Sequence, residues 1–266
     1  ASSGQNSAQT IHLVAEAMRR AYRDRASFLG DPEFFKIPTD KLLSKDYAKK
    51  LRLSINTKKA FQIPAHKKAN FYPESDSTTH LSVVDKQGNA VSSTQTINYL
   101  FGSCVVAEGT GIVLNNEMDD FSSAPGLPNK YGLIGSDANK IEPYKTMLSS
   151  MSPSFVFSEK GKLFLVLGSP GGSRIITTNL QVMLNVLEHK MPLQKAVDAP
   201  RFHHQWLPNT LFVEKNSFSE KILEELKSKG HKITDFKSTM GNVQAILKNE
   251  DGSLEGASDR REIGTA

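Results

Sequence analysis

Cysteine and long apolar runs are nearly missing from this sequence. Cys104 is the single cysteine among 266 residues, which excludes an intramolecular disulfide. No apolar stretch approaches the ~20 residues of a membrane-spanning helix, and no signal peptide is visible at Ala1. Because Ala1 is not an initiator Met, the missing signal peptide says nothing about location. Internal repeats and low-complexity tracts are absent too.

The composition that remains is ordinary for a globular protein, with 38% hydrophobic and 23% charged residues. The length suits one large α/β domain or two small ones. Residues 1–77 hold fourteen Lys and Arg against eight Asp and Glu, whereas residues 78–266 have a net charge of −1. The basic residues stand singly or in pairs such as Lys49-Lys50, without interleaved aromatic residues. This pattern is typical of a solvated surface, so we expect no nucleic-acid partner.

The N-terminal part reads as helices followed by a connector. A helix is predicted over 9–28, because Ile11, Val14, Ala15, Met18 and Tyr22 follow helical spacing, with the Arg residues at 19, 20, 23 and 25 mostly off that stripe. A shorter helix is predicted over 41–51 with Asp40 as its cap. Residues 54–77 resemble a basic connector whose composition would tolerate cleavage.

From Thr78 onward the pattern changes to strands and turns. Strands are predicted over 78–85, 90–97, 111–116, 154–157, 163–167, 243–247 and 254–257, and helices over 178–189 and 219–229. The first two strands form a hairpin with Leu81, Val83 and Val91 on one face. In the helix over 178–189 the residues expected to point inward are Leu180, Met183, Leu184 and Leu187. Residues 117–146 form a long loop, and loops of that length are usually functional or disordered.

Thr78 begins a strand directly after the polar segment 70–77. A hydroxyl at this junction could attack the carbonyl of Ser77, and hydrolysis would leave Thr78 as a new N-terminus. A Thr with a free α-amine carries a general base beside its own hydroxyl. The plainer interpretation is that Thr78 and Thr79 simply begin a β-strand, as Thr often does. His80 is a second candidate base. Because strand neighbours point to opposite faces, His80 faces the same side as Thr78 only if the strand is regular from its first residue.

Three further segments carry groups that could bind a substrate. The turn 168–174 joins a strand to a helix, so its backbone N–H groups could bind an anion or an oxyanion, although its spacing is not that of a P-loop. The hydroxyls of 148–153 could bind a carboxylate. The carboxylates of 117–120 could hold an ammonium group, and without nearby His or Cys they do not define a metal site. Each segment alone also fits an ordinary turn or solvated loop, and the His203-His204 doublet is expected to be structural.

Taken together and in order, these segments resemble the γ-glutamyltranspeptidase family. The resemblance rests on Thr78–Asp85, Thr96–Asn98, Leu114–Phe121, Leu148–Pro153, Gly168–Arg174, Ala199–His203 and Gly256–Asp259. It implies an α+β fold, the four-layer αββα sandwich of N-terminal-nucleophile hydrolases. It further implies a precursor that cuts itself between Ser77 and Thr78 and remains a heterodimer. Residues 1–77 resemble the end of the large subunit, and residues 78–266 the whole small subunit.

The resemblance also implies roles for individual residues. Thr78 would be the nucleophile, oriented by Thr96, and the N–H groups of Gly171 and Gly172 would stabilise the oxyanion. Asn98, Glu117 and Asp120 would hold the amino-acid end of the substrate, with Asp120 chiefly on the ammonium. Ser149 and Ser150 would bind the α-carboxylate of the substrate. Tyr131 would occupy the position of a lid residue over the pocket. The family also uses an Arg of the large subunit to bind the α-carboxylate, and the region that carries this Arg is missing here.

The resemblance implies γ-glutamyl transfer from glutathione and related compounds to water, an amino acid or a dipeptide, with no metal or organic cofactor. The partner would be the remainder of the large subunit, and bacterial members are periplasmic or secreted. One alternative is a related self-processing amidase for another acyl group, such as a β-lactam side chain. The other is an uncut, inactive relative that serves as a binding or structural protein.

Overall fold

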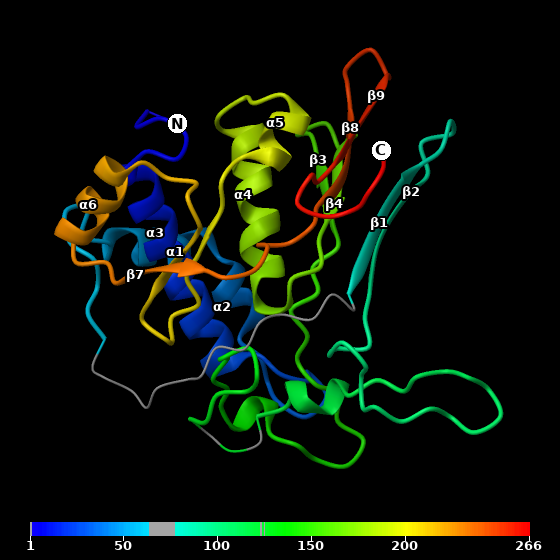
Figure 1. The fold of residues 1–266 in the computed structure, drawn as a ribbon. Coiled ribbons are helices and arrows are strands. Elements are labelled where there is room, and N and C mark those ends of the chain that lie inside the picture. Colours follow the sequence, from blue (N-terminus) through cyan, green and yellow to red (C-terminus); the bar gives the residue numbers. More distant parts are fainter. Residues whose placement is uncertain (1, 64–77, 123, 125) are drawn as a thin grey trace. The chain divides into compact units, whose positions relative to one another are not determined.

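The computed structural model describes residues 2–63, 78–122, 124 and 126–266. These residues form two compact units, and Figure 1 shows their elements. Unit 1 contains the described residues of Ala1–Pro73, Glu117–Ser149 and Phe202–Phe236, and unit 2 those of Glu74–Asn116, Ser150–Arg201 and Lys237–Ala266. Unit 1 contains residues from before and after Thr78, so the two units do not correspond to the predicted segments 1–77 and 78–266. Those segments are the expected products of cleavage, and they stay a prediction. None of the helices described is both long and apolar enough to cross a membrane.

Unit 1 is built on α1 (Ala8–Phe28), whose predicted apolar stripe is largely buried. The same helix buries Arg19 and Arg20, which the sequence places mostly off the stripe. Glu16 explains this burial, because its carboxylate lies 3.2 Å from Arg19 Nε and 2.7 Å from Arg20 Nη1. Buried charges need such partners.

The prediction of a single helix over 41–51 is wrong, because this segment forms two helices. These are α2 (Thr39–Leu43) and α3 (Lys45–Leu53), and Ser44 separates them. Ser44 is extended, and its hydroxyl accepts a hydrogen bond from the Tyr47 N–H at 3.1 Å. Ser44 therefore caps α3, while Asp40 lies in the first turn of α2 and not at a cap.

The rest of unit 1 contains two 3-10 helices, a short sheet and α6. The 3-10 helices are η1 (Glu117–Asp120) and η2 (Asp137–Asn139) within the predicted long loop. The sheet has the order β5 (Phe202–His203), β6 (Leu211–Glu214), β7 (Ile233–Phe236), and the sequence patterns did not predict it. The predicted helix over 219–229 is confirmed as α6 (Glu220–Ser228).

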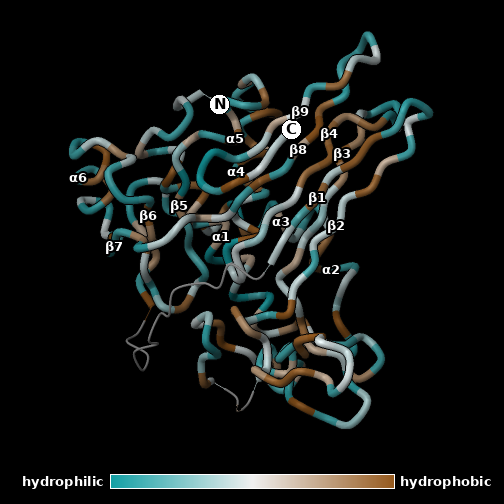
Figure 2. Tube along the Cα trace, turned by 45° about the vertical axis from the view of Figure 1, so that its right-hand side comes forward, coloured by the Kyte–Doolittle hydropathy of each residue, from teal (hydrophilic) through white to brown (hydrophobic). Residues whose placement is uncertain are grey.

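Unit 2 consists of three layers that Figure 1 shows side by side. The central layer is an antiparallel sheet in the order β3 (Ser154–Phe157), β4 (Leu163–Gly168), β8 (Gln244–Lys248), β9 (Leu254–Ser258). Helices α4 (Ile175–Leu187) and α5 (Leu193–Asp198) cover one face, where Leu165, Leu167 and Val182 form the core. The hairpin of β1 (Thr79–Val84) and β2 (Ala90–Gln95) packs on the other face. Figure 2 shows the apolar character of β3, β4 and β8.

The hairpin is confirmed, but its predicted apolar face does not point inward. Leu81, Val83 and Val91 are 42%, 51% and 51% exposed, whereas His80 is 6% exposed. The inward face is polar, and it is bonded to the central sheet through backbone carbonyls. Ser82 Oγ donates to the carbonyl of Gln244 at 3.0 Å, and Ser92 Oγ donates to that of Leu167 at 3.1 Å.

Two other sequence predictions need correction. Residues 111–116 form no strand, only an isolated bridge between Val106 and Val113, and Ile112 is 62% exposed. Helix α4 begins at Ile175 rather than at residue 178. Its most buried face contains both polar and apolar side chains. That face contains Thr178, Gln181, Val182, Asn185 and Val186, while the four residues predicted to point inward are half-buried. Helix α5 was not predicted.

Candidate active site

Thr78 stands at the head of β1 with its hydroxyl bonded to one neighbour. Its Oγ1 lies 2.8 Å from Oγ1 of Thr96, at the far end of the paired strand β2. The antiparallel register, in which Thr79 faces Gln95, brings these two hydroxyls together. The Asn98 N–H donates to Thr96 Oγ1 at 2.8 Å, which fixes the orientation of the Thr96 hydroxyl. The structure therefore brings the predicted pair Thr78 and Thr96 into contact.

His80 takes no part in this pair. Its Nδ1 lies 2.8 Å from Thr94 Oγ1, and its Nε2 lies 3.1 Å from Ser82 Oγ. Burial lowers the pKa of His80 to about 4, so the ring is neutral near pH 7. His80 is a structural residue whose ring nitrogens are bonded within the hairpin and away from Thr78, and whose ring lies against Gly168 of β4.

The glycine turn after β4 has a backbone conformation that favours glycine. Gly171 has a φ of 133° and Gly172 a φ of 50°, a region that side chains other than glycine disfavour. Gly172 begins the 3-10 helix η3 (Gly172–Arg174), which leads into α4. The first N–H groups of a helix lack intrahelical partners and are available to an anion.

A cavity beside Thr78 reaches the residue that precedes these two glycines. It has a volume of about 280 Å³, and its lining includes Thr78, Pro170 and Gln244. Pro170 directly precedes Gly171. Thr78, Thr96 and the glycine turn thus lie within the same compact unit.

Asn98 belongs to the same unit, where it is buried and hydrogen-bonded. It is 4% exposed and has a φ of 72°. Its Nδ2 donates to the carbonyl of Asn116 at 3.1 Å. Asn116 is the residue before Glu117 in the sequence, so Asn98 is bonded to the chain just before the acidic segment.

Glu117 and Asp120 occupy the two ends of η1 in unit 1. Burial raises the pKa of both carboxyl groups. For Asp120 the pKa reaches about 7, because burial acts together with the nearby Glu117 charge, while Arg25 opposes the shift. An acid in such surroundings gains when a cation binds to it, which suits an ammonium ligand.

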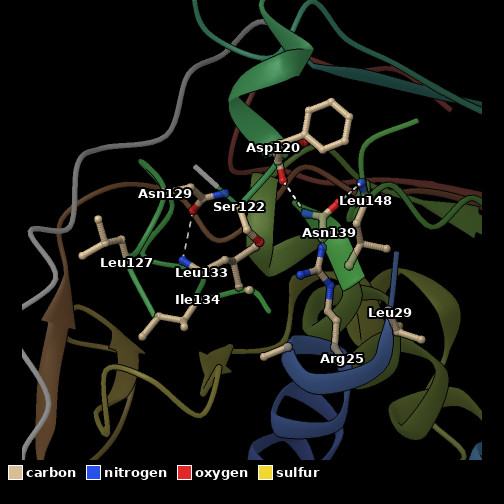
Figure 3. Close-up of a pocket in the computed structure, with 13 residues that line it drawn as sticks. Arg25, Leu29, Asp120, Ser122, Leu127, Asn129, Leu133, Ile134, Asn139 and Leu148 are labelled. Atoms are coloured by element: carbon tan, nitrogen blue, oxygen red, sulfur yellow. Dashed lines mark hydrogen bonds between the residues drawn. The ribbon is translucent and has the colours of Figure 1, made fainter. Parts of the chain in front are cut away.

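Two residues around Asp120 were not assigned a role from sequence. Figure 3 shows Arg25 and Asn139 with Asp120 at a pocket whose lining also includes Ser122 and Leu148. Burial lowers the pKa of Arg25, and the charges of Tyr22 and Asp120 act against that shift. The only sequence signal for Arg25 is a cation on the predicted helix over 9–28, and Asn139 lies in a polar loop without any periodic pattern.

The remaining predicted residues are placed as follows. Ser149 is exposed and Ser150 is half-buried, and the Ser152 hydroxyl donates to the Ser150 carbonyl at 3.0 Å. Tyr131 is 8% exposed, and its carbonyl accepts from Gln205 Nε2 at 3.0 Å. The carboxylate-binding and lid roles of these residues stay predictions. Ser77 lies outside the described residues.

The His203-His204 doublet is structural, as expected. His203 Nε2 lies 2.8 Å from Gln205 Oε1, and its ring makes an edge contact with Tyr22. His204 Nδ1 accepts from the Trp206 N–H at 3.1 Å. Among the residues described there is no cluster of three His, Cys, Asp or Glu side chains that could hold a metal ion.

Comparisons with known proteins identify the family of this chain. The family model for gamma-glutamyltranspeptidase matches residues 1–266. The chain is 50% identical over 261 residues to the glutathione hydrolase proenzyme of Escherichia coli strain K12, covering 98% of this chain and 44% of that protein. The chain thus spans less than half the length of this curated relative.

Solved structures extend the comparison to the fold. Gamma-glutamyltranspeptidase from Pseudomonas nitroreducens, complexed with L-DON, is 53% identical with a TM-score of 0.67, covering 71% of this chain and 97% of that one. Cephalosporin acylase from Bacillus halodurans is 27% identical with a TM-score of 0.80, covering 97% of this chain and 45% of that one. The predicted N-terminal-nucleophile hydrolase fold is confirmed.

Proposed function

The chain belongs to the γ-glutamyltranspeptidase family, and from this premise we propose that it carries the nucleophile of an enzyme that transfers or hydrolyses the γ-glutamyl group of glutathione and related compounds. The observation that carries the proposal is the hydroxyl pair of Thr78 and Thr96, 2.8 Å apart at the head of the hairpin. A buried, neutral His80 beside it leaves the α-amine of a cleaved Thr78 as the general base.

In the proposed reaction the Thr78 hydroxyl attacks the amide carbon of the γ-glutamyl group. The α-amine of Thr78 accepts the hydroxyl proton and passes it to the leaving amine, which for glutathione is cysteinylglycine. The negative oxygen of the tetrahedral intermediate would lie against the N–H groups of Gly171 and Gly172. Removing one oxyanion donor typically lowers the rate about a hundred-fold to a thousand-fold. Water, an amino acid or a dipeptide then attacks the Thr78 ester and frees the nucleophile.

Thr78 can supply its α-amine only if the bond after Ser77 is cut, and self-cleavage is part of the proposal. The relative from Escherichia coli is named a proenzyme, which supports processing. The Pseudomonas nitroreducens chain covers 71% of these 266 residues, or about 189, and the segment 78–266 has the same length. This agreement in the number of residues supports a cut before Thr78.

The head-group residues favour a γ-glutamyl substrate over an apolar acyl group. A γ-glutamyl group carries an ammonium and a carboxylate on one carbon, which need an anion site and a hydroxyl or cation site. Glu117 and Asp120 supply the first, and Ser149 with Ser150 the second. An apolar acyl pocket would need neither, so the acylase alternative, which the Bacillus halodurans relative represents, is the second candidate. An inactive relative is the third, and it is disfavoured because Thr78, Asp120 and the two glycines are present.

The remainder of the large subunit is the proposed partner. Two apolar surfaces support this: the outer hairpin face of Leu81, Val83 and Val91, and a cavity of about 620 Å³ among α1, α2 and α3. Exposed apolar patches of this kind commonly mark interaction sites. A periplasmic or secreted location is proposed from the bacterial family members alone, and no metal or cofactor is required.

A chromogenic γ-glutamyl anilide tests the function directly. Protein from the complete coding sequence should release the aniline, while an anilide with an apolar acyl group should react far more slowly. Thr78→Ala should abolish both this turnover and the cleavage before residue 78, because both need the same hydroxyl. Thr79→Ala is the matched control, since the neighbouring hydroxyl has no role in either step. A preference for the apolar acyl anilide would establish the acylase function instead.

A further inference from the structure

We propose that Asn139 is a positioning residue that holds the ammonium-binding Asp120 and the carboxylate-binding Ser149 at a fixed separation. The inference rests on the proposed γ-glutamyl function and deepens it, since it concerns how the same site selects its substrate. Asn139 touches no reacting atom in the proposed mechanism. It acts through the backbone at both halves of the head-group site.

The side chain of Asn139 is bonded to both segments at once. Its Nδ2 donates to the carbonyl of Asp120 at 2.8 Å, and its Oδ1 accepts from the N–H of Leu148 at 3.0 Å. Leu148 directly precedes Ser149 in the sequence. Figure 3 shows Asn139 between Asp120 and Leu148, with a dashed line to each. One side chain therefore connects two segments that are 28 residues apart in the sequence.

The backbone of Asn139 strengthens the same connection. Its carbonyl accepts from the N–H of Ser122 at 2.8 Å, two residues after Asp120. Asn139 ends η2, whose start is capped by the Ser136 hydroxyl accepting from the Ala138 N–H. The residue is 5% exposed, so solvent does not compete for these bonds. Asn139 is thus a rigid, buried link and not a surface contact.

Only an amide can make both side-chain bonds. The Asp120 carbonyl requires a donor and the Leu148 N–H requires an acceptor, and Asn offers one of each on a short side chain. Asp at this position would keep the bond to Leu148 but would place an oxygen against the Asp120 carbonyl. It would also add a negative charge close to a carboxyl group that is already hard to ionise.

The spacing matters because the substrate head group is small and rigid. Its ammonium and carboxylate share one carbon atom, so both binding groups must be placed to within about 0.5 Å. Loss of the link would let either end bind without the other. The selectivity for a complete γ-glutamyl head group should therefore fall more than the rate of the chemical step.

The test compares Asn139→Asp and Asn139→Ala with the wild type, all produced from the complete coding sequence. Two donors are used, γ-glutamyl p-nitroanilide and glutaryl p-nitroanilide, which lacks the ammonium group. We expect KM for the γ-glutamyl donor to rise about tenfold to a hundred-fold, the loss expected for buried hydrogen bonds. The preference for the γ-glutamyl over the glutaryl donor should fall by a similar factor, while kcat changes little. Cleavage before Thr78 should persist, since Thr78 and Thr96 lie in the other compact unit.

Asn185→Asp is the matched control for a purely structural effect. Asn185 is also a buried Asn, and its Nδ2 donates to the carbonyl of Ala196 at 3.1 Å. This variant should lower the melting temperature without changing the donor preference. Unchanged KM and donor preference in both Asn139 variants would overturn the proposal, as would loss of self-cleavage in step with stability. A wild type that turns over no γ-glutamyl donor would instead overturn the proposed function itself.

Discussion

The hydroxyl of Thr78 is oriented by neighbouring residues, and each of these residues is held in turn by its own hydrogen bonds. Thr96 contacts Thr78, and the Asn98 N–H fixes the Thr96 oxygen. His80, the nearest imidazole in sequence, is bonded to Thr94 and Ser82 instead. The local chemistry therefore fits a nucleophile that must obtain its base from its own backbone nitrogen.

The raised pKa of Asp120 leads to a prediction at the same scale. Burial, reinforced by Glu117, raises this pKa to about 7, so the carboxylate that we propose binds the substrate ammonium is lost as the pH falls below that value. Binding of L-glutamate, which presents the head group without the amide, should weaken about tenfold per pH unit below pH 7. Competitive inhibition measured between pH 5 and pH 9 gives this profile.

Asp120→Asn provides the control for that profile. Without an ionisable group at position 120, glutamate binding should be weak at all pH values and flat between pH 5 and pH 7. A wild-type profile that is equally flat would show that Asp120 does not hold the ammonium. The inhibition constant is compared rather than the rate, because turnover of the competing donor also depends on the protonation of the Thr78 α-amine.

The His80 ring of the hairpin lies against Gly168 of the central sheet, which gives a prediction at the scale of an element. A Cβ on Gly168 would lie 2.2 Å from His80 Cε1, far inside contact distance. Gly168→Ala must therefore displace the His80 ring and break its bonds to Thr94 and Ser82. We expect a loss of about 1–3 kcal/mol in the free energy of unfolding, the usual cost of overpacking.

Chemical denaturation measures this loss, and a second glycine of the same sheet is the control. Gly256 is exposed, and a Cβ there would lie 3.2 Å from the Cβ of Ala266, a contact that a small shift relieves. Gly256→Ala should therefore cost much less. Equal stability of the two variants would mean that the His80 ring does not fix the hairpin.

A buried charge cluster fastens the end of α5 to the strand β9. Arg201 Nη2 lies 2.7 Å from Asp259 Oδ2, and Arg261 Nη1 lies 3.0 Å from Asp259 Oδ1. Burial acts to raise the pKa of Asp259, but Arg201 and Arg261 together with the Val243 N–H lower it below its ordinary value. The carboxylate therefore stabilises the fold above its unfolded pKa of about 3.9, and this stabilisation is lost as the pH falls through the lower folded value.

Asp259→Asn should remove that contribution. Breaking a buried ion pair typically costs about 3–5 kcal/mol, because the partner charges stay buried. Urea denaturation at pH 7 should show the loss, and the difference from wild type should shrink in strong acid. Asp251→Asn, at an exposed turn, is the control and should change stability little. A similar effect of both substitutions would argue against the cluster.

The sequence predicted those elements whose own pattern decides their structure. Helix α1, the hairpin, the β3–β4 pair and α6 have strong periodicity or clear turns, and all are present. The three-stranded sheet has strands as short as Phe202–His203, too short for any period to appear. The inward face of the hairpin depends on which backbone carbonyls Ser82 and Ser92 reach, and those belong to distant strands.

In the candidate site, too, the sequence predicts only those residues that belong to a local motif. Thr78, the glycine turn and the acidic segment stand out as motifs. Arg25 and Asn139 do not, because their importance comes from a contact with Asp120 about 95 and 19 residues away in the sequence. Tertiary contacts of this kind leave no local signal.

At the scale of the whole molecule, the proposed cleavage would leave two pieces that remain associated. Within unit 1, residues before Thr78 are bonded to residues after it. His12 Nδ1 lies 2.8 Å from His231 Nε2, and the Ala60 N–H donates to the carbonyl of Lys229 at 2.7 Å. Arg19 Nη1 also donates to Asn209 Oδ1 at 2.6 Å. These bonds do not depend on the peptide bond at Thr78, so both pieces should elute together in native chromatography.

The most direct test of the account is the intact mass of the purified protein from the complete coding sequence, with N-terminal sequencing of each fragment. We expect two co-eluting fragments, one of which begins at Thr78 and disappears in the Thr78→Ala variant. A single uncut chain that is folded and stable would contradict it, because Thr78 would then have no free amine and could not serve as its own base.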